Sequence, residues 1–209
     1  MTESNINFLE PSQQQLYNLL EHYQAGRYAE AEKLSLSITQ EFPKHQFAWK
    51  VLAAVLKQNG RIKESLFASQ KTVQLDPQDA EAHSNLGNTL KGLGKSEEAE
   101  ACYKKAITLK PGYAEAHYNL GNTIKEQGRL EEAEASYKKT ITLKPDYAEA
   151  HNNLGITLKE LGKLDEAEVS YKKAITFKPD YAEAHSNLGV ILKEQGRLEE
   201  AEASYKKAI

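Results

Sequence analysis

The stretch AEAHYNLGNTIKEQGRLEEAEASYKKTITLKPDY, from Ala114 to Tyr147, decides the fold. It is 34 residues long, and the following stretch from Ala148 to Tyr181 is identical to it at 25 positions. A self-similar period of this length is typical of a repeat array, in which each repeat buries its apolar face only against its neighbours. We therefore expect one continuous repeat body rather than a compact globular domain.

The same register extends over most of the chain. The repeats are expected to span 12–45, 46–79, 80–113, 114–147, 148–181 and 182–209, with the last one truncated. One column of the alignment holds glycine in every repeat: Gly26, Gly60, Gly94, Gly128, Gly162 and Gly196. Residues 1–11 are predicted to form a polar N-terminal tail, and Pro11 followed by Ser12 indicates the first helix start.

Each repeat is expected to form two helices. The first helix of the central repeat has apolar or small residues with a 3.6-residue period, at Ala116, His117, Leu120, Gly121 and Ile124. The second helix has such a face at Leu130, Ala133, Tyr137, Thr140 and Ile141. Gly128, which tolerates a positive φ, is predicted to end the first helix, and Pro145 to stop the second.

Two local contacts also follow from the sequence. Gly121 and Ala133 are small residues on opposing helices, so they are expected to let the two backbones approach closely. Asp146-Tyr147-Ala148-Glu149 is similar to an acidic capping box and is predicted to open the next repeat.

At these residues the chain resembles the tetratricopeptide repeat (TPR) family. The family signature combines a large residue and Leu-Gly on the first helix with Ala, an aromatic residue and Pro on the second, here His117, Leu120, Gly121, Ala133, Tyr137 and Pro145. The resemblance covers residues 12–209 and implies an all-α fold, an α-solenoid forming a right-handed superhelix of helix-turn-helix units. The chain departs from the signature at Asn18-Leu19, which replaces Leu-Gly, and at the histidines that replace Trp in most repeats, although Trp49 keeps it in the second.

Composition excludes several classes of function. The net charge of −3 does not favour nucleic-acid binding. No apolar run approaches 18 residues and the N-terminus lacks a secretory signal pattern, so no membrane span is expected. The single cysteine, Cys102, cannot form an intrachain disulfide and favours a reducing compartment, so a cytoplasmic location is expected.

No catalytic constellation recurs in the repeats. His83, His117, His151 and His185 form a column, but packed helices lie about 8–10 Å apart, too far for neighbouring histidines to share a zinc ion. We interpret them as core-packing residues and Cys102 as a structural thiol. The sequence also lacks a P-loop, a dinucleotide-binding fingerprint and zinc-binding motifs. We therefore expect no enzyme activity, no metal and no cofactor.

The side of the first helix opposite the core stripe carries polar residues. In the central repeat these are Glu115, Tyr118, Asn119, Asn122, Lys125 and Glu126, and the equivalents elsewhere are Asn85, Asn88, Lys91, Asn152, Asn153, Lys159, Asn187 and Lys193. In TPR proteins the first helices line a concave groove, and the resemblance implies the same here. Asn85, Asn119, Asn153 and Asn187 would form a ladder along it, similar to the TPR region of O-linked N-acetylglucosamine transferase.

An asparagine amide both donates and accepts hydrogen bonds, which suits an extended peptide backbone whatever its side chains. The alternative is that these asparagines are merely solvated helix-face residues. Glu81, Glu115, Glu149 and Glu183 either make the groove edge acidic or only start the helices. A clamp for a C-terminal carboxylate, known in chaperone-type TPR domains, is disfavoured because Ser84, Tyr118, Glu81 and Asn85 occupy positions where Lys or Arg is expected.

The sequence thus predicts a protein–protein interaction scaffold whose groove binds an extended peptide or a partner helix. Two alternatives remain open. Because the last repeat ends at YKKAI, the array could be the N-terminal recruitment domain of a larger enzyme, such as a glycosyl- or sulfotransferase. The same uncapped repeat could also mediate homo-oligomerisation by stacking.

Overall fold

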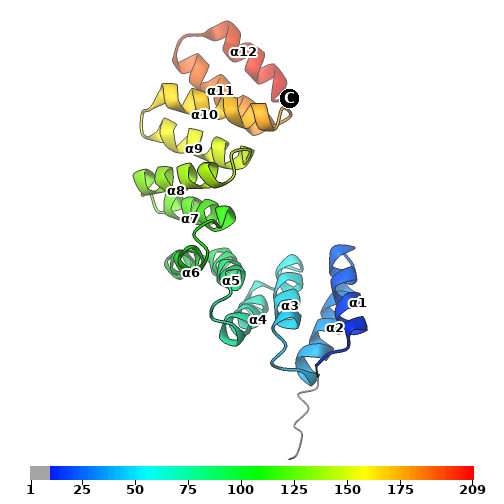
Figure 1. The fold of residues 1–209 in the computed structure, drawn as a ribbon. Helices are drawn as coiled ribbons and strands as arrows, with labels where there is room; N and C mark the ends of the chain where they lie inside the picture. The colour runs from blue at the N-terminus through cyan, green and yellow to red at the C-terminus, as the bar shows by residue number, and fades with distance from the viewer. Residues whose placement is uncertain (1–9) are drawn as a thin grey trace, which may run out of the picture. The chain divides into compact units, whose positions relative to one another are not determined.

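The computed structural model describes residues 10–209, and these residues form twelve α-helices and no strand (Figure 1). The helices are α1 (Gln13–Gln24), α2 (Tyr28–Glu41), α3 (Gln46–Gln58), α4 (Ile62–Leu75), α5 (Ala80–Gly92), α6 (Ser96–Leu109), α7 (Ala114–Glu126), α8 (Leu130–Leu143), α9 (Ala148–Glu160), α10 (Leu164–Phe177), α11 (Ala182–Glu194) and α12 (Leu198–Lys207). The prediction of two helices per repeat is confirmed. Most of the predicted N-terminal tail lies outside the described residues.

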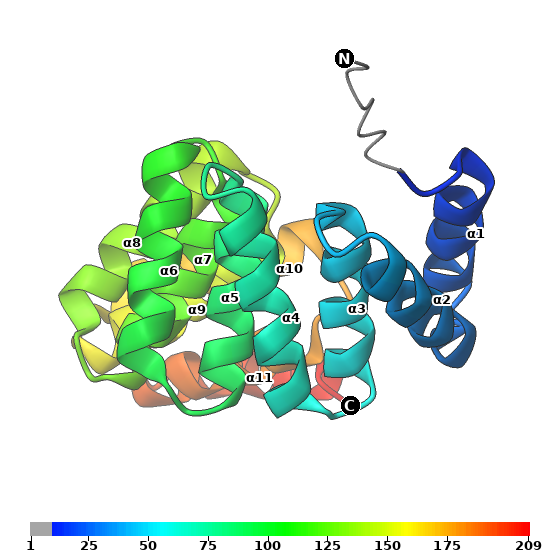
Figure 2. The ribbon, with the colours of Figure 1, turned by 90° about the horizontal axis from the view of Figure 1, so that it is seen from below.

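The chain divides into two compact halves between Leu109 and Lys110. In the N-terminal half, α3 contacts α1, α2 and α4, and α5 contacts α4 and α6. In the C-terminal half, α9 contacts both α7 and α11, while each of these three helices also packs on its own partner, α8, α10 or α12. The two helices of each pair lie side by side (Figures 1 and 2). Each half is therefore an all-α solenoid segment built from consecutive helix pairs.

The turn between the two helices of a repeat depends on glycine. Gly128 has a φ of 78°, and the glycines of this column in the other five repeats have φ values between 70° and 78°. A side chain is strained at such angles, whereas glycine adopts them without steric strain. The prediction that Gly128 ends the first helix is confirmed, because α7 ends at Glu126 and α8 begins at Leu130.

The core of the C-terminal half repeats one contact between the helices of a pair. Tyr137 is fully buried and its ring lies against Gly121, where an added Cβ would be 2.8 Å from Cε1 of the ring. Gly155 and Tyr171 repeat this contact in α9 and α10. The small residue at 121 therefore accommodates the Tyr137 ring, a contact that the sequence analysis did not predict.

The helix starts follow two patterns. Ser12 is the N-cap of α1, which confirms the predicted helix start, and it forms a complete capping box with Gln15. The acidic capping box predicted at residues 146–149 is wrong, since the N-cap of α9 is Tyr147 and its side chain makes no capping hydrogen bond. Asp146 lies one residue too early to cap this helix, whereas Asp79 occupies the N-cap of α5 and accepts from the Ala82 N–H.

Among residues 10–209, no helix is long and apolar enough to cross a membrane.

Successive repeats of the C-terminal half are connected by ion pairs. The Glu134 carboxylate on α8 accepts from Lys138 at 2.6 Å and from Lys163 of the next repeat at 2.8 Å. These charge-assisted contacts lower the pKa of Glu134, Lys138 contributing most.

Candidate functional site

Three first helices of the C-terminal half, α7, α9 and α11, present the polar residues predicted from the sequence. We call the amide face the surface of these helices that carries Tyr118, Asn119, Asn122, Asn153 and Asn187. All five side chains are half-buried, so each keeps some exposure to solvent. The helices are neighbours, because α9 contacts both α7 and α11. The predicted residues of this half are thus brought onto adjacent helices.

A hydrogen-bond network joins α7 to α9 on the amide face. The side-chain amide of Asn153 donates to the Tyr118 hydroxyl at 3.1 Å and to Oδ1 of Asn122 at 2.9 Å. Oδ1 of Asn122 also accepts from the hydroxyl of the buried Tyr137 at 2.7 Å. Because both protons of the Asn153 amide are used in these bonds, its Oδ1 is the atom left for a ligand.

The next pair of helices uses asparagine differently. Asn152 was expected in the exposed polar stripe, but it is fully buried. Its amide donates to Glu183 at 3.1 Å, and its Oδ1 accepts from Asn187 at 3.1 Å. Asn152 therefore connects α9 to α11, and the expectation that it lies in the groove is wrong.

Asn119 differs from the other members of the amide face. Within residues 10–209 its side-chain amide makes no hydrogen bond, although the residue is half-buried. Its donors and its acceptor are consequently all available. Since Asn153 lacks free donors, Asn119 is the residue of this face best able to bond both the N–H and the C=O of a passing peptide.

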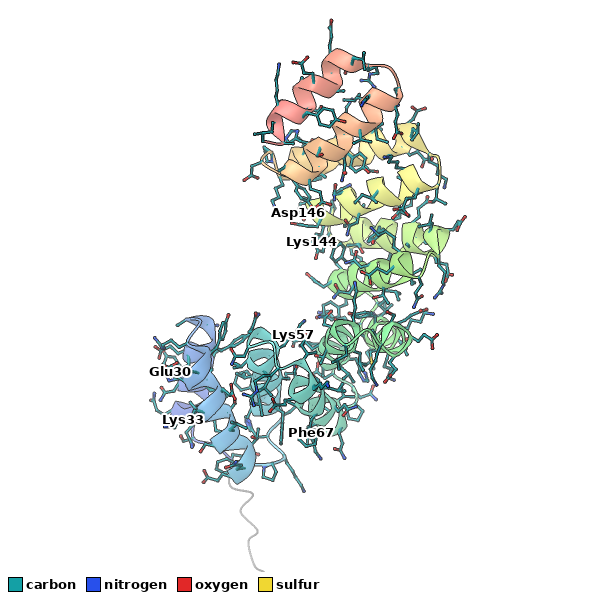
Figure 3. All side chains as sticks on the ribbon, turned by 180° about the vertical axis from the view of Figure 1, so that it is seen from behind. Glu30, Lys33, Lys57, Phe67, Lys144 and Asp146 are labelled. Carbon is teal, nitrogen blue, oxygen red and sulfur yellow. The ribbon has the colours of Figure 1, made fainter. Side chains whose placement is uncertain are left out.

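Tyrosine rings form one edge of the amide face. The rings of Tyr118 and Tyr147 have centroids 4.8 Å apart, with 31° between their planes. The ammonium of Lys144, on the turn before α9 (Figure 3), lies 4.7 Å from the centroid of the Tyr147 ring. Burial, followed by the neighbouring Tyr118, Glu115 and Glu149, raises the pKa of Tyr147 to about 12. These phenols are therefore neutral hydrogen-bonding groups near pH 7.

The predicted lysines of this half are not equivalent. Lys159 pairs with Glu194 at 3.2 Å. Lys125 is half-buried and Lys193 is exposed, and the ammonium group of neither makes an ion pair or a hydrogen bond with a residue that the structure describes. The face therefore offers two free ammonium groups together with the carboxylates of its edge, and it is mixed in charge as the sequence indicated.

The histidine column has a structural role. Nε2 of His151 lies 2.9 Å from the carbonyl oxygen of Pro145, and His83, His117 and His185 repeat this contact with the proline six residues earlier. The indole of Trp49 donates to Pro43 in the same way. Burial lowers the pKa of His117 and His151, which favours the neutral imidazole. Within the described residues, no three His, Cys, Asp or Glu side chains gather as metal ligands.

In the N-terminal half, the predicted residues have two different surroundings. Oδ1 of Asn88 accepts from the hydroxyl of buried Tyr103 at 2.8 Å, so part of its hydrogen-bonding capacity is used inside the repeat. Lys91 is half-buried. Asn85 is exposed and makes no side-chain hydrogen bond within the described part of the chain.

Asn85 also lines a pocket that the sequence did not predict. This pocket, which we call the Ser69 pocket, has a volume of about 250 Å³, is partly open to solvent and is lined by residues of α1, α3, α4 and α5. Its lining residues are Tyr23, Lys50, Ala53, Ala54, Lys57, Gln58, Ser69, Thr72, Glu81, Ala82, Asn85 and Thr89. Two features of the sequence could have indicated it. Ser69 occupies the repeat position at which Tyr103 and Tyr137 supply a large ring, so space could be expected there. Lys57 occupies the repeat position of Lys91 and Lys125, which were predicted to lie on the groove.

Sequence models of known families match much of the chain. Models described as tetratricopeptide repeat match residues 80–113, 102–135 and 184–209. A model described as TPR repeat matches residues 121–162 and 157–196. Together these matches span residues 80–209. Among curated proteins, none matches the chain.

Solved structures resemble the fold. The crystal structure of MamA is 28% identical over 75% of this chain and 92% of that chain, with a TM-score of 0.70. PilW, a type IV pilus biogenesis factor, is 23% identical over 93% and 91%, with a TM-score of 0.83. YrrB, a TPR protein with an unusual peptide-binding site, is 23% identical over 84% and 90%, with a TM-score of 0.67. The likeness to PilW and YrrB concerns the fold.

Proposed function

Because the chain belongs to the tetratricopeptide repeat family, we propose that its amide face binds an extended segment of a partner protein. The repeats make the chain a protein–protein interaction scaffold. The proposal adds which face binds and what it recognises. One structural neighbour, YrrB, has a peptide-binding site of its own, which is consistent with a peptide ligand on this fold.

The observation that carries the proposal is the unused amide of Asn119. This amide is half-buried between hydrogen-bonded neighbours, on a face where Asn153 keeps a free Oδ1. An extended peptide rises about 3.3 Å per residue, and neighbouring helices lie about 8–10 Å apart. One asparagine would then meet roughly every third residue of the peptide. Recognition would be directed at the backbone and would tolerate many side-chain sequences.

The test is to select extended peptides from a random library on the purified chain and to measure their affinity for Asn119→Ala. Losing one or two hydrogen bonds of about 1 kcal/mol each should weaken binding roughly 5- to 30-fold. Thr142→Ala is the matched control, since Thr142 is exposed on α8, in the other layer. Equal affinity for all three proteins would exclude the amide face as the binding surface.

The double substitution of Asn119 and Asn153 is a less specific test. Removing the Asn153 side chain also removes the two hydrogen bonds that connect α9 to Tyr118 and Asn122. A loss of binding could then come from a rearranged face. Asn119→Ala avoids this because its amide holds no other described residue.

Two further properties belong to the proposal. We assign binding rather than catalysis to the array, and we place the chain in the cytoplasm because its one cysteine needs no oxidising compartment.

Self-association is the second candidate function. A pocket on α11 and α12, lined in part by Ala182, Asn187, Tyr205 and Ile209, leaves Tyr205 half-buried where Tyr171 is 1% exposed. A molecular mass that rises with concentration would support it, and a constant monomer mass would contradict it.

A further inference from the structure

The Ser69 pocket exists because one helix pair lacks the residues that fill its successor. Between α5 and α6, Gly87 makes room for the ring of Tyr103, and Asn88 accepts a hydrogen bond from its hydroxyl. The equivalent positions between α3 and α4 hold Ala53, Ala54 and Ser69. The ring and its amide partner are both missing, and a pocket of about 250 Å³ lies where they would be.

The first repeat also lacks the tyrosine ring, but the absence of the ring leaves no space there. Its residues at the glycine and tyrosine columns are Leu19 and Ser35. Leu19 is fully buried, so a large residue on the first helix replaces the ring that normally comes from the second. The α3–α4 pair has a small residue on both helices, which is why the pocket forms there.

The lining of the pocket is polar and apolar in similar measure, and its apolar part suits an aromatic side chain. Ala53, Ala54 and Ala82 contribute methyl groups. The buried hydroxyls of Thr72 and Thr89 already donate to the backbone at Ala68 and Asn85, at 3.0 Å each. A cavity of about 150 Å³ is large enough for benzene, so the Ser69 pocket, which is larger and partly open to solvent, has room for a phenyl ring.

The two lysines that line the pocket, Lys50 and Lys57, differ in their charged partners. Lys50 pairs with two carboxylates, Asp79 at 2.5 Å and Glu81 at 3.1 Å, which more than compensate its charge. The side-chain ammonium of Lys57, near the end of α3 (Figure 3), makes no ion pair or hydrogen bond with any described residue. Partial burial lowers the pKa of Lys57, because its ammonium loses water without gaining a carboxylate. A carboxylate brought by a ligand would provide that missing partner.

We propose that the Ser69 pocket anchors one aromatic side chain of a partner peptide, with an acidic residue beside it that pairs with Lys57. The aromatic ring takes the space that Tyr103 fills in the following repeat. Exposed Asn85, on the same pocket wall, bonds the peptide backbone. This inference rests on the proposed peptide-binding function but concerns a different site, in the N-terminal half of the chain.

The experiment is calorimetric titration of the full chain with the peptide acetyl-Gly-Asp-Phe-Asp-Gly-amide. Because both ends are blocked, no terminal charge contributes. Replacing Phe by Ala should weaken binding about tenfold or more, since the burial of one phenyl group is lost. Replacing both Asp by Asn should weaken it about two- to fivefold, and Lys57→Gln should cause the same loss while abolishing the preference for Asp.

The decisive variant combines Ala53→Gly, Ala54→Asn and Ser69→Tyr, which gives α3 and α4 the residues of α5 and α6. It should lose at least tenfold in affinity for the Phe peptide. Equal affinity of the parent and the triple variant would overturn the proposal, as would binding that is indifferent to the Phe-to-Ala change. If the triple variant unfolds more easily than the parent, Ala54→Leu at the half-buried rim is the second blocking variant, with the same expected loss.

Asn119→Ala separates this proposal from the amide face. The Phe peptide should bind Asn119→Ala as it binds the parent, whereas the library-selected peptides should bind that variant more weakly. If the selected peptides ignore Asn119 while the Phe peptide still requires an open pocket, the amide face is wrong and the anchor pocket stands. The reverse result would reject only the pocket.

Discussion

The helix pairs α3–α4 and α5–α6 follow one 34-residue register, but they fill their interiors differently. In α5–α6, Tyr103 is fully buried against Gly87 and its hydroxyl is bonded to Asn88. In α3–α4, the same positions hold Ser69, Ala53 and Ala54, and a pocket lined by polar and small residues remains. The comparison teaches that a repeat keeps its two helices when its central ring is absent, and that a pocket remains between them.

The first way to break this comparison is Tyr103→Ser, which makes α5–α6 resemble α3–α4. Removing a fully buried aromatic side chain leaves a cavity and should lower the free energy of unfolding by about 3–5 kcal/mol. Urea unfolding followed by circular dichroism measures this change. A loss below about 1 kcal/mol would mean that the ring contributes little and that the difference between the two pairs has no energetic consequence.

Gly87→Ala is the second and smaller perturbation. The added methyl group would lie 2.7 Å from Cε1 of the Tyr103 ring, and a buried ring cannot move away freely. Overpacking of this kind should cost about 1–3 kcal/mol in unfolding free energy. The matched control is Gly92→Ala in the same helix, where the nearest atom is 3.5 Å away. That change should stabilise by up to about 1 kcal/mol through helix propensity, and a destabilising result there would reject this account of the two glycines.

The α3 repeat and the repeats of the C-terminal half should also differ in how their stability depends on pH. Trp49 donates to Pro43 in the α3 repeat, whereas His117 and His151 contact their prolines in the C-terminal half. Burial lowers the pKa of both histidines, so the folded state binds fewer protons than the unfolded state near pH 6. The stabilisation is therefore complete above the unfolded pKa of about 6.5 and decreases as the pH falls below it.

Hydrogen exchange of the α7 and α9 amides at pH 7.5 and 5.5, corrected for the intrinsic exchange rates, measures this small effect. Their protection should decrease at pH 5.5 while that of α3 changes less. His117→Trp with His151→Trp should keep the contact to proline and reduce the pH dependence. An unchanged pH dependence in this variant would show that other groups are responsible.

Much of the fold could be predicted because the repeat fixes it. The glycine column gave the turns and the 3.6-residue period gave the buried faces, and both are determined by residues within one repeat. The capping box failed by a single position, because Asp146 precedes the N-cap and Tyr147 occupies it. Sequence periodicity locates a helix start less accurately than a single hydrogen bond requires.

The site was harder to predict because its residues act across repeats. Asn153 and Asn122 are 31 positions apart, and their hydrogen bond depends on how α7 and α9 pack. The same packing buries Asn152, although its neighbours in the stripe are half-buried. The Ser69 pocket could have been noticed, since Ala53 and Ser69 are both small where one large residue is needed. The small residues at these two repeat positions can be read from the sequence, but the pocket that they leave can be located only once the packing of the helices is known.

The central claim is that the amide face binds an extended peptide. The most direct test is a chemical-shift map of the isotope-labelled chain with a library-selected peptide bound. The account predicts that the side-chain amide signals of Asn119, Asn153 and Asn187 shift together as peptide is added, with the largest shift at Asn119. Shifts confined to residues of α8, α10 and α12 would contradict it, because the peptide would then bind the opposite layer of helices.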